Sequence, residues 1–235
     1  MTRAEMLIEL YAVLNADSAS PPAGWSEASL LRYLAEGQDK FCEQTGYFRD
    51  ITNYSLTLQT GVAVYAIPDR TIQVLDIWDG TRKLGKILPD STTVSDEWPE
   101  DLGAAATGPP AQWRTDQTTG YIKLMQTPTA AENGDVLTLH LWRYSRYDLA
   151  GSGAVPEGGG AAPPAAPELP SRFQLACVEW AAYKAFNIHD MEAQDPVKAK
   201  DHLDNFKGYV SDGIAQMRRY HNQETRVGMD PAYRT

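Results

Sequence analysis

Hydrophobic residues in the first part of the chain recur every three or four positions, which is the spacing of an amphipathic helix. This pattern predicts a first helix over about residues 2–15 and a second helix that begins after Ser26. The Ser26 hydroxyl can cap the second helix, and Gly46 is a natural stop because glycine readily adopts the left-handed conformation. Residues 1–50 are therefore expected to be helical.

From Ile51 the apolar residues alternate with polar ones, which is the period of a strand with one buried face. Asp79 and Gly80 form a strong hairpin signal between the third and fourth expected strands. Six short antiparallel strands are expected, at about residues 54–58, 62–67, 71–78, 83–88, 121–125 and 136–144. They predict an antiparallel β domain over residues 51–148, built as a sandwich or a small barrel.

A stretch rich in Gly, Ala and Pro follows the strands: 16 of the 21 residues at 150–170 are of these three types. Such a composition buries too little apolar area to form a core element, so residues 149–170 are expected to be an exposed loop. Helical periodicity then predicts two C-terminal helices over residues 171–221, the second starting at Asp195, and an extended tail over 222–235. The first of these helices is apolar around most of its circumference and needs partners on several sides.

These elements predict an α+β fold, in which a helical domain made of the N- and C-terminal helices carries the inserted β domain. The net charge of −10 over 235 residues opposes general nucleic-acid binding, which needs Lys and Arg to neutralise phosphates. No uncharged apolar run approaches the roughly 20 residues of a membrane helix, and Glu5 and Glu9 interrupt any secretory leader. Cys42 and Cys177 are expected to be small buried thiols, with a disulfide as the alternative.

Residues with catalytic or metal-binding chemistry are scattered. The four histidines show no His-x-x-x-His spacing, and the sequence has no nucleophile elbow, no Walker lysine and no Cys-x-x-Cys. The acidic pairs at 96–97 and 100–101 flank Pro99, which is typical of a solvated loop rather than of an acid–base pair. We therefore predict no catalytic, cofactor-binding or metal-binding residue and no enzymatic activity.

The C-terminal end differs in charge from the rest of the chain. Residues 218–235 contain four arginines against Glu224 and Asp230, a net charge of +2, which leaves −12 on the other residues. A mildly basic end with Tyr220, Met229 and Tyr233, attached to an acidic body, indicates a peptide that docks on another protein. The alternative is a solvated terminus, the common state of chain ends.

Several short segments occur in a characteristic order along the chain. They lie at residues 41–46, 56–68, 74–84, 110–113, 120–124, 137–144 and 169–173. This order resembles that of the head-to-tail adaptor proteins of tailed bacteriophages, the group that includes tail tubular protein A, or gatekeeper. Residues 60–68 correspond to the family pattern x-G-x-x-x-Y-x-L-P, and the resemblance covers roughly residues 26–220. The insertion at 150–167 and the stretch at 100–110 depart from the family pattern.

The resemblance implies a structural virion protein of the neck or tail, assembled in the host cytoplasm. About twelve copies would form a ring between the portal protein and the tail or nozzle protein. Genomic DNA would pass through the lumen without specific binding, and an acidic lumen wall would suit that passage.

The resemblance also implies two sets of contact residues. The tail would dock on the portal protein through Arg218, Arg219, Tyr220, Arg226, Met229, Tyr233 and Arg234. Uncovered faces of the first C-terminal helix would contact neighbouring subunits through Phe173, Trp180, Tyr183 and Phe186.

Two other classes of function stay open at this point. A carbohydrate- or ligand-binding β module of a tail component would use exposed Trp and Tyr, although Trp78 and Trp142 fall in expected strands, where packing is the commoner role. A small enzyme would use unassigned acids in a cleft. Neither alternative accounts for the terminal helices and the tail together.

Overall fold

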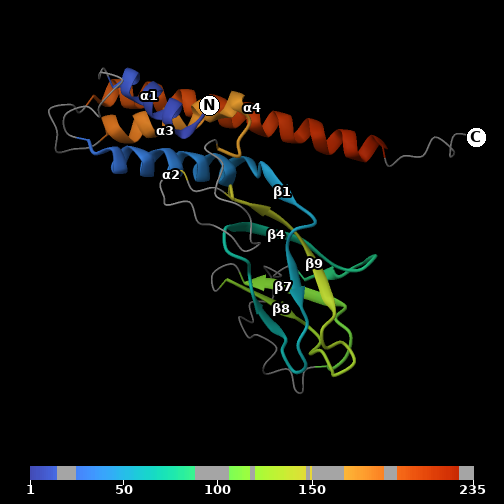
Figure 1. The fold of residues 1–235 in the computed structure, drawn as a ribbon. Coiled ribbons are helices and arrows are strands. Elements are labelled where there is room, and N and C mark those ends of the chain that lie inside the picture. The colour runs from blue at the N-terminus through green and yellow to red at the C-terminus, as the bar shows by residue number, and fades with distance from the viewer. Residues whose placement is uncertain are drawn as a thin grey trace, which may run out of the picture. The chain divides into compact units, whose positions relative to one another are not determined.

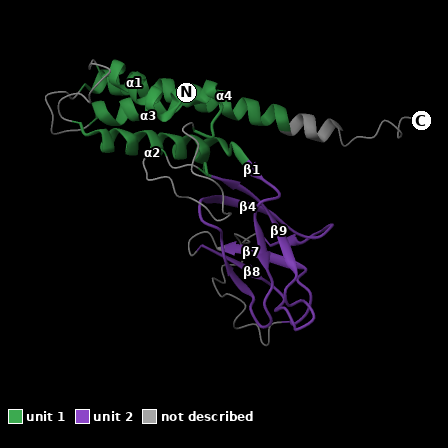
Figure 2. Cartoon of the chain, viewed as in Figure 1, with its two compact units in different colours: residues 1–48, 144–235 green, residues 49–143 purple. Residues whose placement is uncertain are grey.

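The computed structural model describes residues 1–14, 25–87, 106–116, 120–146, 149, 167–187 and 195–227, with side chains described as far as residue 220. Over these residues the chain has four helices and nine strands, so the α+β class is confirmed. The chain divides into two compact units, residues 1–48 with 144–235 and residues 49–143 (Figure 2). The acidic pairs at 96–97 and 100–101 and most of the Gly/Ala/Pro-rich stretch lie outside the described residues.

Unit 1 contains all four helices: α1 (Arg3–Val13), α2 (Glu27–Thr45), α3 (Ser171–Phe186) and α4 (Pro196–Val227) (Figure 1). Local capping explains where the helices begin and end. The Ser26 hydroxyl accepts a hydrogen bond from the Ser29 N–H, and Gly46 ends α2 in the left-handed conformation, with φ 59°. The Asp195 carboxylate accepts hydrogen bonds from the first backbone N–H groups of α4.

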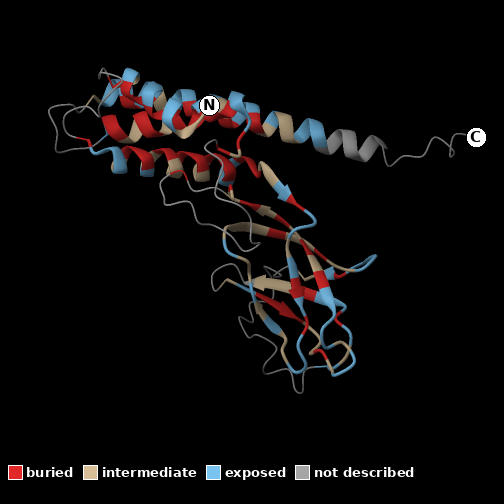
Figure 3. Cartoon of the chain, viewed as in Figure 1, coloured by how far each residue is buried: buried red, intermediate tan, exposed pale blue. Residues whose placement is uncertain are grey.

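The helix α3 lies at the centre of unit 1 and contacts α1, α2 and α4. Its buried positions are marked red in Figure 3. The ring of Phe173 lies 5.0 Å from that of Phe41 on α2, and the ring of Trp180 lies 5.0 Å from that of Phe206 on α4. Three helices of the same chain therefore cover the apolar faces of α3, which explains why its sequence is apolar around most of the circumference.

The helix α4 is longer than the sequence pattern indicates: it ends at Val227 rather than near Tyr220. The first residues of the segment expected to be extended, 222–227, are thus helical. The apolar stripe that marks the buried face stops near Met217, so periodicity alone could not detect the last turns. In Figure 1, α4 runs past the ends of the other helices of the unit.

Unit 2 contains two sheets. The strands of the first are β1 (Phe48–Asp50), β9 (Val136–Arg143), β4 (Thr71–Asp79) and β5 (Arg82–Lys83), in that order, with β2 (Ser55–Thr57) also paired to β9. The strands of the second are β3 (Val64–Ala66), β8 (Tyr121–Leu124), β7 (Gln112–Asp116) and β6 (Gly85–Lys86). One apolar cluster unites the sheets and includes Val74 and Leu139 of the first with Trp113 and Ile122 of the second.

Two expectations about the strands were wrong. The strand expected over residues 83–88 is split: Lys83 pairs with Trp78 in the first sheet, whereas Gly85 pairs with Gln112 in the second. The pairing of β6 with β7 is parallel, so the β unit is not purely antiparallel. The strands β1 and β7 were also not predicted, because neither short segment shows clear alternation of apolar and polar residues.

Candidate functional site

Candidate chemistry is sparse in the part of the chain that the structure describes. Its His, Cys, Asp and Glu side chains include no group of three that could hold a metal ion. None of its helices combines the length and the apolar character that a membrane span requires. Cys42 and Cys177 are both buried and are not joined in a disulfide, as expected for small core thiols, and burial raises the pKa of the Cys177 thiol far above its usual value.

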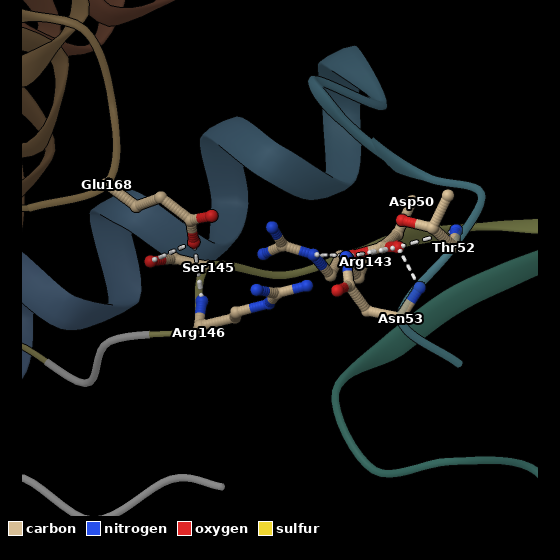
Figure 4. Close-up of polar contacts among 7 residues, drawn as sticks. All are labelled: Asp50, Thr52, Asn53, Arg143, Ser145, Arg146 and Glu168. Atoms are coloured by element: carbon tan, nitrogen blue, oxygen red, sulfur yellow. Dashed lines mark hydrogen bonds and ion pairs between the residues drawn. The ribbon is translucent and has the colours of Figure 1, made fainter. Parts of the chain in front are cut away.

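A buried ion pair lies where the chain enters and leaves unit 2 (Figure 4). Asp50 is the last residue of β1 and Arg143 is the last residue of β9, and the two strands are neighbours in the sheet. The Nε of Arg143 lies 3.3 Å from Oδ2 of Asp50, with both side chains more than nine-tenths buried. The Asp50 carboxylate also accepts hydrogen bonds from the backbone N–H groups of Thr52 and Asn53 and from the Asn53 amide.

A second polar cluster lies in unit 1, just after the chain returns to it (Figure 4). The Oε2 atom of Glu168 accepts a hydrogen bond from the Arg146 N–H at 2.8 Å and one from the Ser145 hydroxyl at 3.4 Å. Ser145 is fully buried, so the contact anchors the segment that leads to α3. Both clusters hold backbone segments in place.

The structure places the four predicted subunit-contact residues in two different environments. Phe173 and Phe186 are buried inside unit 1, where Phe186 stacks on His202 with ring centroids 5.6 Å apart. Trp180 and Tyr183 are half-buried, and their ring centroids are 5.3 Å apart. Only this second pair reaches the surface of unit 1.

Trp180 and Tyr183 line a shallow groove of about 660 Å³ between α2 and α3. The walls of this α2/α3 groove carry three cations, one carboxylate, three aromatic rings and one amide. The lining residues are Arg32, Tyr33, Glu36 and Lys40 from α2 and Trp180, Tyr183, Lys184 and Asn187 from α3 and its C-cap. Sequence reasoning missed the groove, although the positions 32, 36 and 40 recur every four residues on one face of α2.

Two of the three cations in the groove have carboxylate partners. Lys184 donates to Glu36 at 3.2 Å, and Lys40 donates to Glu43 at 2.7 Å, a hydrogen bond that raises the pKa of Lys40. Arg32 has no carboxylate partner among the described side chains, and its guanidinium lies 5.7 Å from the ring centre of Tyr33. The groove therefore has an excess of positive charge in a chain whose net charge is −10.

The residues predicted to dock on the portal lie at and beyond the end of α4. Arg218, Arg219 and Tyr220 are exposed, and Gln216 donates to the Tyr220 hydroxyl at 3.2 Å. Arg226 belongs to the last turn of α4, with its side chain outside the described part. Met229, Tyr233 and Arg234 lie outside the described residues.

The sequence was compared with protein families and with curated proteins. The family model for the SU10 adaptor protein matches residues 1–232, which is nearly the whole chain. The comparison with curated proteins gave no match.

Proposed function

The chain belongs to the SU10 adaptor protein family, and from that membership we propose that it is a structural protein of a bacteriophage virion, the adaptor between head and tail. In this proposal about twelve copies form a ring between the portal protein and the tail or nozzle protein, and the ring continues the DNA channel. The observation that carries the proposal is the match of the family model over residues 1–232.

The division of the chain supports a structural role. Unit 1 has its own core around α3, and unit 2 has its own apolar cluster, which we propose to be a sandwich of its two sheets. Two separately packed units can present two different surfaces, one to each neighbour along the virion axis. Trp180 and Tyr183 are the proposed subunit contacts at the surface of unit 1, while Phe173 and Phe186 support the helix that carries them.

The net charge of the chain supports the proposal that the protein lines the DNA channel. A net charge of −10 makes the protein repel a polyanion, so DNA can pass an acidic wall without binding to it. The +2 carried by residues 218–235 lies on the segment proposed to dock on the portal protein, which begins with the exposed residues Arg218, Arg219 and Tyr220 of α4.

Electron microscopy of the purified protein, with and without the portal protein, tests this proposal. We expect rings of the adaptor alone or on the portal ring. A protein that stays monomeric in both samples would contradict the ring. A reconstruction whose lumen is predominantly basic would contradict the proposed channel wall.

A carbohydrate-binding module of a tail component is the second candidate. It is favoured by Trp78 and Trp142, which the register of β4 and β9 places on one face of the first sheet and which are half-buried. Trp78 also stacks on His140, with ring centroids 5.5 Å apart. Binding of the isolated protein on a glycan array would support this candidate, and the absence of binding would remove it.

A further inference from the structure

We propose that the α2/α3 groove is a binding site for an acidic segment of a second copy of this chain, residues 90–101. The proposal rests on the proposed ring, because it assigns the contact between neighbouring copies. The groove supplies positive charge and aromatic surface, and the segment supplies negative charge and a tryptophan.

The chemistry of the groove is suited to an acidic peptide. Arg32 and Lys40 are eight residues apart on α2, which separates them by about 12 Å along the helix. Tyr33 also lines the groove, with the Nζ of Lys184 5.9 Å from its ring centre. The indole N–H of Trp180 is buried and has no hydrogen-bond partner among the described residues.

The sequence contains one segment with complementary chemistry. Between Lys86 and Arg114 there are five acidic residues and no Lys or Arg, so this segment carries half of the net charge of the chain. Four of the five acids flank Trp98 and Pro99, as Asp96-Glu97-Trp98-Pro99-Glu100-Asp101. Residues four apart in an extended peptide are about 13 Å apart, which matches the spacing of Arg32 and Lys40 along α2.

The two partners of this contact are different surfaces of the same chain. Each copy can therefore offer its groove to one neighbour and its acidic segment to the other. Such a heterologous contact repeats from copy to copy and closes into a ring when the rotation between copies permits. The contact thus gives a physical basis for ring assembly. Tryptophan and tyrosine side chains supply the area buried in the contact, and the opposite charges orient the segment in the groove.

Complementary variants of the full chain test the contact. The groove variant carries Arg32→Glu and Lys40→Glu. The segment variant carries Asp96→Asn, Glu97→Gln, Glu100→Gln and Asp101→Asn. The matched control carries Lys200→Glu and Lys207→Glu on the exposed face of α4, which changes the net charge as much as the groove variant does.

Native mass spectrometry of these proteins should show rings for the wild type and the control, and monomers for each of the other two variants. A mixture of the groove variant and the segment variant should form heterodimers and no rings, because only one complementary contact is left between them. Rings formed by the groove variant, or a mixture that stays monomeric, would overturn the proposal.

A labelled peptide of residues 88–103 measures the contact directly. It should bind the segment variant, whose groove is free, and introducing the two groove substitutions into that protein should weaken binding about tenfold or more. Raising the salt concentration well above 0.1 M should also weaken it, because Arg32 and Lys40 in the groove are accessible to solvent. Equal binding of polyphosphate, or binding of the Trp98→Ala peptide with undiminished affinity, would identify a general polyanion site and overturn the assignment.

The outcomes separate this inference from the proposed function. If the wild type and the groove variant both form rings, the proposed ring is supported and the groove is excluded as the contact between copies. If the peptide binds specifically but the protein never forms rings, the groove and its ligand are supported and the proposed ring is contradicted.

Discussion

The carboxylate of Asp50 and the guanidinium of Arg143 form an ion pair that joins the first and last strands of the β unit. The Nε to Oδ2 distance is 3.3 Å, and the two side chains are 4% and 7% exposed. Because Asp50 and Arg143 lie beside the two points where the chain passes between its units, the pair fixes both ends of the inserted segment. An ion pair of this kind specifies geometry more than it adds net stability, because its desolvation offsets much of its attraction.

Removal of one partner should be costly. Asp50→Ala leaves the Arg143 guanidinium buried without this carboxylate and removes the acceptor for the Thr52 and Asn53 N–H groups. We expect the β unit to lose about 3 kcal/mol of stability, measured by denaturant unfolding and by hydrogen exchange of the β9 amides. The exposed Asp69→Ala is the control and should change stability by less than about 0.5 kcal/mol. Equal effects of the two substitutions would contradict the structural role of the pair.

Two helical glycines should respond in opposite directions to alanine. A Cβ at Gly37 would lie 2.9 Å from the Trp180 Cβ and 3.0 Å from the Cys177 carbonyl oxygen, whereas a Cβ at Gly208 would meet nothing within 4 Å. Gly37→Ala should therefore destabilise the helical unit by about 1–3 kcal/mol through overpacking of α2 against α3. Gly208→Ala should stabilise it by up to about 1 kcal/mol, because alanine is the better helix former. Thermal unfolding followed by circular dichroism measures both, and a stabilising Gly37→Ala would show that α2 and α3 are not packed this closely.

The helices could be predicted from the sequence because their signals are local. Ser26, Gly46 and Asp195 mark helix ends through bonds to backbone only a few residues away. The hairpin of β4 and β5 was also predicted, from its Asp79-Gly80 turn, but the other strand partners could not be predicted in the same way. Gly85 pairs with Gln112 across a long sequence separation and in parallel, and nothing in the residues near Gly85 indicates that partner.

The candidate site could be predicted only in part. Trp180 and Tyr183 were predicted as subunit contacts from the apolar circumference of α3, but the same reasoning selected Phe173 and Phe186, which α2 and α4 cover. Periodicity shows which residues are apolar and cannot show how many helices of the same chain are available to cover them. The groove depends on α2 and α3, which lie far apart in sequence, so its full lining requires the structure.

The pH behaviour of Glu132 should depend on Thr129. The Thr129 hydroxyl donates to the Glu132 carboxylate at 2.6 Å and its backbone N–H donates at 2.7 Å, and these bonds hold the pKa of Glu132 below its usual value. A carboxyl whose pKa is lowered by folding stabilises the fold above its unfolded pKa, and that contribution is lost as the pH falls through the folded pKa.

Thr129→Val should raise the pKa of Glu132 part of the way towards its usual value, because the hydroxyl is lost and the backbone N–H is kept. Carbon-detected NMR titration of the Glu132 carboxyl measures the change. Thr81→Val, in the exposed turn between β4 and β5, is the control and should leave the pKa of Glu132 where it is. An unchanged pKa in Thr129→Val would mean that the hydroxyl contributes nothing to the shift.

Truncation of the C-terminal residues should separate folding from attachment to the portal. The buried contacts of α4 with the rest of unit 1 include Ala199, Phe206 and Val210, and residues 218–220 are already exposed. Deletion of residues 222–235 should therefore leave the unfolding temperature unchanged and remove only the helical signal of residues 222–227, while co-sedimentation with the portal protein is lost. Deletion of residues 228–235 alone keeps α4 whole to Val227 and shows whether its last turns or the residues beyond them make the contact. Undiminished binding of the longer truncation would place the portal contact elsewhere on the chain.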